Sequence, residues 1–308
     1  MSETAKKADV YEIVTGRIIE QLEKGIVPWR KPWTVDAGPP RNLITGRKYN
    51  SINLLLLNTF NYPQNLFLTF KQVTEIGAKI KGGAKGHLIA FWKWPKKNEE
   101  GKQAEKQNTP YLRYYYVFNI DQCVGIPESI LPANNLSRPN DPIESCLKIV
   151  NEMPNKPKIE HLSKDACYRV RTDSVHMPNI EHFLDDDSYY QTLFHELIHS
   201  TGHESRLNRK EIVNPEKFAS ENYAIEELTA QIGMCYLMSE AGVGEMHFDN
   251  SVAYIQTWLR RLRNDKRLIV YASSQAQKAT DFILNVKEKH EDSAGTLDFS
   301  SPVVSEAV

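Results

Sequence analysis

The chain has 308 residues, of which 41% are hydrophobic and 25% are charged, and its formal net charge is −1. These values are ordinary for a water-soluble protein, and no apolar run approaches the ~20 residues that cross a bilayer. The four cysteines form no C-x-x-C pair, which argues against a thiolate zinc site and a disulfide framework. The first residues lack the apolar core of a signal peptide, so we expect a cytoplasmic protein without membrane contact.

The charge is divided unevenly along the chain. Residues 1–122 hold 19 Lys and Arg against 11 Asp and Glu, a net charge of +8, whereas the remainder carries −9. A basic half suits a polyanion and an acidic half does not. The chain is long enough for two domains, and this division is expected of two domains with different partners. The alternative is uneven surface charge without any ligand.

The first predicted helix covers residues 8–24, where apolar positions recur at helical spacing and Gly25 supplies a stop. Prolines hold the following segment extended, and it interleaves aromatic with cationic side chains. An aromatic face for a base, next to a cation for a phosphate, is what unpaired nucleic acid requires. The alternative is that the tryptophans pack inward and the cations are only solvated. The predicted contacts are Trp29, Arg30, Lys31 and Trp33.

Two short helices are predicted next. Residues 52–60 form an apolar run, and Thr69 with Gln72 matches a capping box at the start of a second helix. Gly77 is expected to close that helix.

Basic loops and aromatic strands complete this half of the chain. Arg47 lies in a basic turn, and Lys81 and Lys85 alternate with glycines in a loop whose backbone amides can meet phosphates. We expect these three cations to contact nucleic acid. Strands are predicted at residues 87–94 and 111–120, and their aromatic side chains either stack on bases or form core.

Many spaced positions in this half match one family. They are Pro28-Trp29, Lys31-Pro32-Trp33, Thr45-Gly46-Arg47, Leu68-Thr69-Phe70-Lys71-Gln72, Lys81-Gly82, Lys85-Gly86 and Val117-Phe118-Asn119. With them, residues 8–125 resemble the N-terminal domain of the ArdC antirestriction family, which also occurs in TraC-type primases. The resemblance implies a domain that binds single-stranded DNA. Family members often carry glycine where Ser51 stands, at a predicted turn.

The metal motif lies in residues 192–203, which contain His-Glu-x-x-His within an apolar run that favours a helix. Residues four apart share a helix face, so His195 and His199 can bind one metal ion. Glu196 can reach a water on that ion as general base. This is the zincin signature, and the alternative is two surface histidines paired with carboxylates. In zincin folds an edge strand beside the helix pairs with a peptide, and residues 173–177 are our candidate.

A catalytic zinc ion has three protein ligands and one water, so a third ligand is needed. The metzincin pattern would require histidine at the position of Ser205. His203 lies beyond Gly202, where the helix is expected to end. Glutamate from a second helix is the gluzincin arrangement, and about 100° of rotation per residue places Glu227 nearer the apolar stripe than Glu226. We therefore predict Glu227 as the third ligand, with Glu226 as the alternative.

The resemblance continues through this half. The matching residues are His195-Glu196-Leu197, His199, Thr201-Gly202-His203, Ser205-Arg206-Leu207-Asn208-Arg209, Tyr223-Ala224 and Glu226-Glu227-Leu228. They are similar to the zincin-like metallopeptidase domain of the same ArdC family. Family members often have Trp at the position of Ser200 and Glu at that of Gln231, and a neutral amide there weakens the expected support of the metal ligands.

The resemblance implies antirestriction, the protection of incoming mobile-element DNA, as in conjugation, from host restriction. It implies single-stranded DNA as one partner and a host restriction-system protein as the peptidase substrate. The expected cofactor is Zn²⁺ or another divalent ion such as Mn²⁺. Two alternatives stay open: a DNA-binding decoy whose metal site is structural or vestigial, and a metal-dependent nuclease.

The sequence thus predicts an α+β fold with two domains. We expect a DNA-binding domain at residues 1–125, a proline-rich linker at 126–142, a metallopeptidase domain at 143–290 and a disordered polar tail at 291–308. Arg206 follows the metal helix and is expected to pair with an acid rather than with a substrate.

Overall fold

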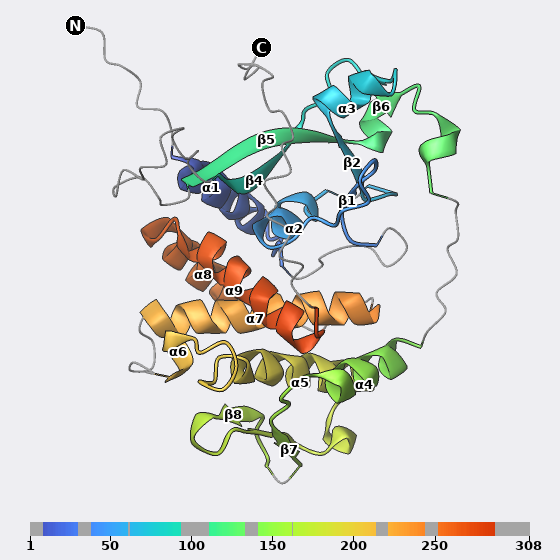
Figure 1. Cartoon of the computed structure of the whole chain (residues 1–308). Helices are drawn as coiled ribbons and strands as arrows, with labels where there is room; N and C mark the ends of the chain where they lie inside the picture. The colour runs from blue at the N-terminus through green and yellow to red at the C-terminus, as the bar shows by residue number, and fades with distance from the viewer. Residues whose placement is uncertain are drawn as a thin grey trace, which may run out of the picture.

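The computed structural model describes residues 9–29, 38–60, 62–93, 111–132, 141–161, 163–213, 221–243 and 252–286. Helices and strands are mixed in both halves, which confirms the predicted α+β class. No described helix is both long enough and apolar enough to cross a membrane. The elements stack in layers, with a sheet at one end, helices in the middle and a smaller sheet at the other end (Figure 1).

A four-stranded sheet organises the N-terminal half, in the order β1-β2-β5-β4. Its long antiparallel pair runs from His87 opposite Val117 to Lys93 opposite Tyr111, close to the predicted strands. Helices α1 and α2 lie beneath this sheet, whereas α3 lies at its far end (Figure 1). The bounds are α1 Val10–Glu23, β1 Arg41–Asn42, α2 Ile52–Leu57, β2 Leu66–Thr69, α3 Phe70–Glu75, β3 Lys79–Ile80, β4 His87–Lys93, β5 Tyr111–Asn119 and β6 Cys123–Val124.

Local side-chain chemistry fixes several of these helix ends. The Asp9 carboxylate accepts the backbone N–H of Tyr11 at the start of α1. The predicted capping box is confirmed, since Thr69 accepts the N–H of Gln72 and the Gln72 side chain accepts the N–H of Thr69. Gly77 follows this helix with a φ of 76°, the left-handed conformation that closes helices.

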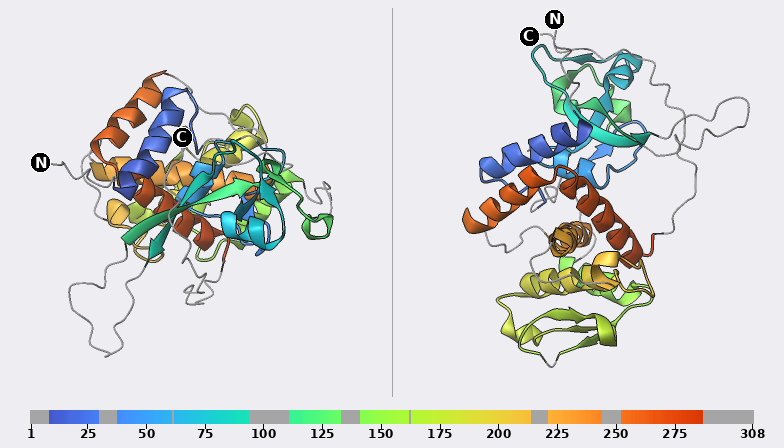
Figure 2. Two further views of the ribbon diagram at one scale, coloured as in Figure 1. Left: turned by 90° about the horizontal axis from the view of Figure 1, so that it is seen from above. Right: turned by 90° about the vertical axis from the view of Figure 1, so that its left-hand side faces the viewer.

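The C-terminal half is mostly helical. Helix α7 packs against α5 on one side and against α9 on the other. Although α8 and α9 come last in the sequence, they lie against α1 and α2 of the N-terminal half (Figure 2). The helix bounds are α4 Pro142–Glu152, α5 Asp186–Ser200, α6 Lys210–Val213, α7 Glu221–Ala241, α8 Val252–Asn264 and α9 Leu268–Ile283.

A three-stranded sheet covers the outer side of α5, and its strand order corrects one prediction. The order is β7-β9-β8, with bounds Lys158–Glu160, Ser174–His176 and Cys167–Arg169 respectively. The predicted edge strand at residues 173–177 is therefore wrong, because β9 is paired on both sides. The two edge strands, each with one neighbour, are β7 and β8, and β8 is the one that contacts α5.

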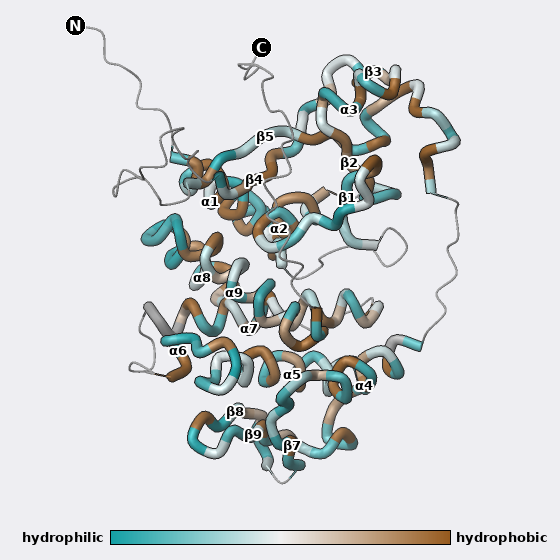
Figure 3. Tube along the Cα trace, viewed as in Figure 1, coloured by the Kyte–Doolittle hydropathy of each residue, from teal (hydrophilic) through white to brown (hydrophobic). Residues whose placement is uncertain are grey.

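One hydrophobic core joins the two halves. Val14 and Leu55 from α1 and α2 belong to the same buried cluster as Leu237 and Ile269 from α7 and α9. Hydrophobic positions run through the stacked helices of both halves (Figure 3). At this interface the Thr15 hydroxyl donates to the Lys266 carbonyl at 2.6 Å. The halves therefore pack as one body rather than as two separate units.

The predicted linker is only partly described. Ile126 and Leu131 pack on the small core beneath α3, and helix α4 begins at Pro142. Residues 133–140 and the predicted tail at 291–308 lie outside the described residues.

Ser51 has a strained backbone at the interface. Its φ is 53° and its ψ is −136°, a region that glycine adopts readily and other residues avoid. Its N–H donates to Gln277 Oε1 at 3.0 Å, and its carbonyl accepts the Tyr236 hydroxyl at 2.9 Å. Contacts with the C-terminal half on both sides therefore hold this conformation.

Replacing Ser51 by glycine should relieve the strain and stabilise the protein. We expect a gain of about 1 kcal/mol and a melting temperature higher by about 2–4 °C in differential scanning calorimetry. Ser51→Ala is the matched control, because it also removes the hydroxyl but keeps the strain. Equal melting temperatures for the two variants would show that the backbone conformation costs nothing.

Candidate metal centre

Helices α5 and α7 approach closely where they cross. A Cβ atom added to Gly233 on α7 would lie 2.6 Å from Ile198 Cδ1 on α5. Glycine is therefore the residue that permits this spacing. The close crossing brings the carboxylates at the start of α7 next to the histidines of α5.

Three side chains converge at this crossing. His195 Nε2 lies 3.2 Å from His199 Nε2 and 3.4 Å from Glu227 Oε1, and His199 Nε2 lies 3.9 Å from Glu227 Oε2. Ligands at about 2.0–2.2 Å from a tetrahedral zinc ion are roughly 3.3–3.6 Å apart. The three residues therefore fit one divalent ion, and they form a described His/Glu group whose ligand atoms lie within 4.8 Å of one another.

Glu226 points away from the three converging side chains and contacts the far side of the His199 ring. One of its oxygens lies 3.0 Å from His199 Nδ1, and both oxygens accept from the Arg209 guanidinium, at 2.7 and 2.9 Å. Arg209 is buried and also donates to Thr201 Oγ1. With Nδ1–H donating to Glu226, the lone pair of His199 Nε2 faces Glu227, which is the tautomer a metal ligand requires.

Burial and charge set the protonation states. Burial and the neighbouring His199 lower the pKa of His195, so this histidine stays neutral. Burial acts against the ionised form of Glu226, but Arg209 and His199 outweigh it and lower the pKa of Glu226 to about 2. Glu226 is therefore a permanent anion at neutral pH.

Glu196 lies beside the ligands with its carboxylate held by the small sheet. Its Oε2 accepts the backbone N–H of Tyr168, on the edge strand β8, at 2.7 Å. Burial raises the pKa of Glu196 above its ordinary value. A carboxylate with a raised pKa next to a metal centre suits proton transfer near neutral pH.

Arg206 fixes the strand that holds Glu196. Its guanidinium makes two hydrogen bonds to the Asp173 carboxylate, at 2.7 and 2.9 Å. Asp173 Oδ1 also accepts the Tyr168 hydroxyl at 2.8 Å. Arg206 therefore pairs with an acid, as predicted, and Arg209 does the same with Glu226.

The alternative third ligands are placed elsewhere. His203 Nδ1 lies 2.8 Å from Ser205 Oγ and is not part of the cluster. Glu226 is engaged by Arg209. The geometry thus favours Glu227, which the sequence also favoured, but Glu226 is the more buried of the two, with 6% of its side chain exposed against 27%.

The predicted DNA contacts divide into three groups. Trp29 is completely buried and packs edge-on against Trp258, so its ring offers no face to a base and this prediction is corrected. Arg30, Lys31 and Trp33 lie outside the described residues. The remaining three, Arg47, Lys81 and Lys85, are exposed.

An exposed aromatic residue lies against the segment that carries two of these cations. Tyr116 on β5 is 42% exposed, and a Cβ atom added to Gly86 would lie 2.9 Å from its Cβ. Lys85 precedes this glycine, and its carbonyl is held by Gln122. Lys81 is anchored to the same turn through the Asp121 carbonyl. The aromatic composition of β5 was visible in the sequence, but this neighbourhood was not.

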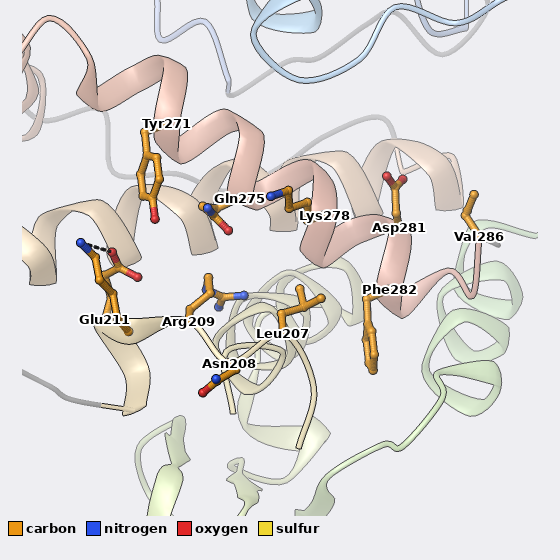
Figure 4. Close-up of a pocket in the computed structure, with 11 residues that line it drawn as sticks. Leu207, Asn208, Arg209, Glu211, Tyr271, Gln275, Lys278, Asp281, Phe282 and Val286 are labelled. Atoms are coloured by element: carbon orange, nitrogen blue, oxygen red, sulfur yellow. Dashed lines mark ion pairs between the residues drawn. The ribbon is translucent and has the colours of Figure 1, made fainter. Parts of the chain in front are cut away.

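A separate cavity of about 710 Å³ lies between α9 and the segment around α6 (Figure 4). Arg209 and Glu211 line it, and Tyr271 projects from α9 toward Glu211 (Figure 4). Glu211 Oε1 is buried without a hydrogen-bond partner. None of the three metal-centre residues lines this cavity, so it is distinct from the metal centre.

Comparison with known proteins agrees with this architecture. Residues 8–118 match the N-terminal domain of anti-restriction factor ArdC, and residues 150–275 match a zincin-like metallopeptidase. These matches define the class: an antirestriction-type N-terminal domain followed by a zincin-like metallopeptidase domain.

Relatives and solved structures identify the family. Crystal structures of antirestriction ArdC from plasmid R388, metal-free and Mn(II)-bound, are 36% and 35% identical, with TM-scores of 0.71 and 0.70. Each comparison covers 90% of this chain, and 97% and 98% respectively of the other. The chain belongs to the ArdC antirestriction family.

Longer relatives also match. Two DNA primases TraC from Escherichia coli are 34% and 31% identical over 92% of this chain, which spans only 28% and 20% of their lengths. An uncharacterized protein, y4eC, from Sinorhizobium fredii is 30% identical over 89% of this chain and 91% of its own.

The buried ion pair predicts a non-additive effect on stability. Arg209→Met leaves the buried Glu226 carboxylate without its counter-ion and with only the His199 hydrogen bond, and should lower the free energy of unfolding by about 3–5 kcal/mol. Adding Glu226→Gln removes that charge, so the double variant should recover a large part of the loss. Urea denaturation in the presence of a chelator measures both. Additive losses would show that the two residues do not act as a pair.

Proposed function

We propose that this protein counters restriction by binding single-stranded DNA through its N-terminal half and by hydrolysing a peptide bond at the metal centre. The observation that carries the proposal is the convergence of His195, His199 and Glu227 next to the buried carboxylate of Glu196. Membership of the ArdC family supports the antirestriction role. A host restriction-system protein is the proposed substrate.

In this proposal the three converging residues hold a divalent ion such as Zn²⁺ or Mn²⁺. Such an ion, when bound, polarises a substrate carbonyl and makes water a stronger acid. The chemistry of the donors fits, because two neutral imidazoles and one carboxylate are the gluzincin ligand set. The Mn(II)-bound structure of the R388 protein supports a divalent metal.

Glu196 is the proposed general base. It accepts a proton from the attacking water and returns it to the leaving amine, and its raised pKa brings it closer to the working pH for both transfers. The Tyr168 N–H orients the carboxylate. Because β8 is an edge strand packed on α5, an extended peptide can add to it beside the centre.

The proposed DNA surface combines Arg47, Lys81 and Lys85 with the exposed ring of Tyr116. Cations hold the phosphates, and the ring offers a stacking face to a base. Arg30, Lys31 and Trp33 remain proposed contacts from the sequence. Since every base has an aromatic face and phosphates carry no sequence information, we expect little sequence preference.

Glu196→Gln tests the catalytic proposal. The amide oxygen can still accept from Tyr168, so folding, DNA binding and Mn²⁺ binding should be kept, while hydrolysis is lost. The readouts are cleavage of purified restriction-system proteins by mass spectrometry and protection of transferred plasmid DNA in a restricting recipient. Glu227→Gln should instead lose Mn²⁺ affinity. Full protection by Glu196→Gln would favour a DNA-binding decoy, and metal-dependent scission of the DNA would favour a nuclease.

A double variant tests the DNA surface. Lys81→Ala with Lys85→Ala should weaken binding to oligo(dT) and reduce the slope of log affinity against log salt by about 1.4, since each phosphate contact on a single strand contributes ~0.7. The matched control is Lys148→Ala with Lys210→Ala, two exposed lysines of the C-terminal half. Fluorescence anisotropy measures both. Equal slopes for the two variants would place the DNA on another surface.

A further inference from the structure

The candidate metal ligand Glu227 has a partner outside the centre. Gln231, one turn later on α7, donates its amide Nε2–H to Glu227 Oε1 at 3.1 Å. The other end of the same amide, Oε1, accepts the hydroxyl of Tyr254 from α8. The amide of Gln231 is thus held at both ends, and it points a donor at the carboxylate.

The contact continues into the N-terminal half. The Tyr254 oxygen accepts the indole Nε1–H of Trp29 at 3.3 Å. Trp29 is completely buried, packed edge-on against Trp258 at a ring-centroid distance of 6.0 Å. Trp29 directly precedes Arg30 and Lys31 in the chain, two of the proposed DNA contacts.

The groups at the two ends of this row of hydrogen bonds determine which atoms donate and which accept along it. An indole N–H can only donate, and an ionised carboxylate can only accept. Tyr254 therefore accepts a hydrogen bond from Trp29 and donates its hydroxyl to Gln231 Oε1, while the Gln231 NH₂ group donates to Glu227. The hydrogen bonds from Trp29 to Glu227 therefore run in one consistent sense, and removing the Tyr254 hydroxyl interrupts them.

We propose that Gln231 and Tyr254 are positioning residues for Glu227, and that through Trp29 they couple metal binding to DNA binding. The inference rests on the proposed function. DNA held by Arg30 and Lys31 restrains the adjacent indole, and the hydrogen-bonded path then restrains the carboxylate. Metal ions bind more tightly to a ligand that is already oriented. Single-stranded DNA should therefore raise the affinity for metal, and metal should raise the affinity for DNA by the same factor.

Other polar contacts between the halves supply a matched control. Tyr236 donates from α7 to the Ser51 carbonyl at 2.9 Å, across the same interface and from a more deeply buried residue than Tyr254. This hydroxyl donates to Ser51 rather than to a side chain that holds Glu227. Tyr236→Phe and Tyr254→Phe thus each remove one interface hydroxyl, but only the second interrupts the path to Glu227.

The experiment is isothermal titration of the full chain with Mn²⁺, with and without oligo(dT), for wild type, Tyr254→Phe, Gln231→Met and Tyr236→Phe. We expect Tyr254→Phe and Gln231→Met to weaken Mn²⁺ binding by about 10-fold or more. We expect oligo(dT) to raise the Mn²⁺ affinity of the wild type and of Tyr236→Phe, but not of the other two. Oligo(dT) affinity without metal should be equal in all four, and melting curves verify their folding.

Three outcomes would overturn the inference. Wild-type Mn²⁺ affinity in both Tyr254→Phe and Gln231→Met would show that Glu227 needs no support from this path. An equal loss in Tyr236→Phe would assign the effect to the interface in general. A wild-type Mn²⁺ affinity that oligo(dT) leaves unchanged would remove the coupling. Failure of the wild type to bind Mn²⁺ at all would instead remove the proposed function on which the inference rests, so the two failures are distinguishable.

Discussion

The buried pair of Arg209 and Glu226 is the interaction on which the metal centre depends. A guanidinium removed from water requires a full set of acceptors, and Glu226 supplies two of them. This commitment keeps Glu226 out of the centre and leaves Glu227 as the carboxylate that faces the histidines. The remaining interaction of Glu226, with Nδ1 of His199, then aims the other ring nitrogen at the same point. One ion pair thereby determines both which carboxylate faces the histidines and which nitrogen of His199 faces the same point.

The layered packing connects the candidate metal centre to helices from both halves of the chain. Helix α7 carries Glu227 and is packed between α5 and α9, while α8 and α9 are the surface on which α1 and α2 lie. A change in the N-terminal half can therefore reach α7 through one layer of helices. This is a stiffer arrangement than two domains joined by a linker, because packed helices move as units and a shared core resists separation.

Much of the fold and the metal motif could be predicted from the sequence, because the signals are local. Helical spacing, the Thr69 capping box and His-Glu-x-x-His each involve residues within about one turn. What the sequence did not show depends on tertiary contacts. Glu227 faces the histidines, but the apolar stripe is not the reason, since Glu226 is the more buried residue because Arg209 compensates its charge. Trp29 resembled a stacking residue until α8 was known to cover it, and the edge position of β8 depends on which strands pair.

Two positions at which we expect a departure from the family pattern have a physical explanation in the structure. Ser51 keeps a glycine-like backbone because Gln277 and Tyr236 hold it, so a serine at this position costs strain within the interface. Gln231 stands next to Glu227 at a position where the resemblance leads us to expect a glutamate, and a second anion there would repel the Glu227 carboxylate unless a proton were shared between them. The amide avoids this repulsion, since it donates to the carboxylate and accepts from Tyr254 at once. The Gln231 amide therefore matches both neighbours, although a neutral side chain is expected to support a metal ligand less well than a glutamate. The orientation of Glu227 then depends on hydrogen bonds rather than on charge.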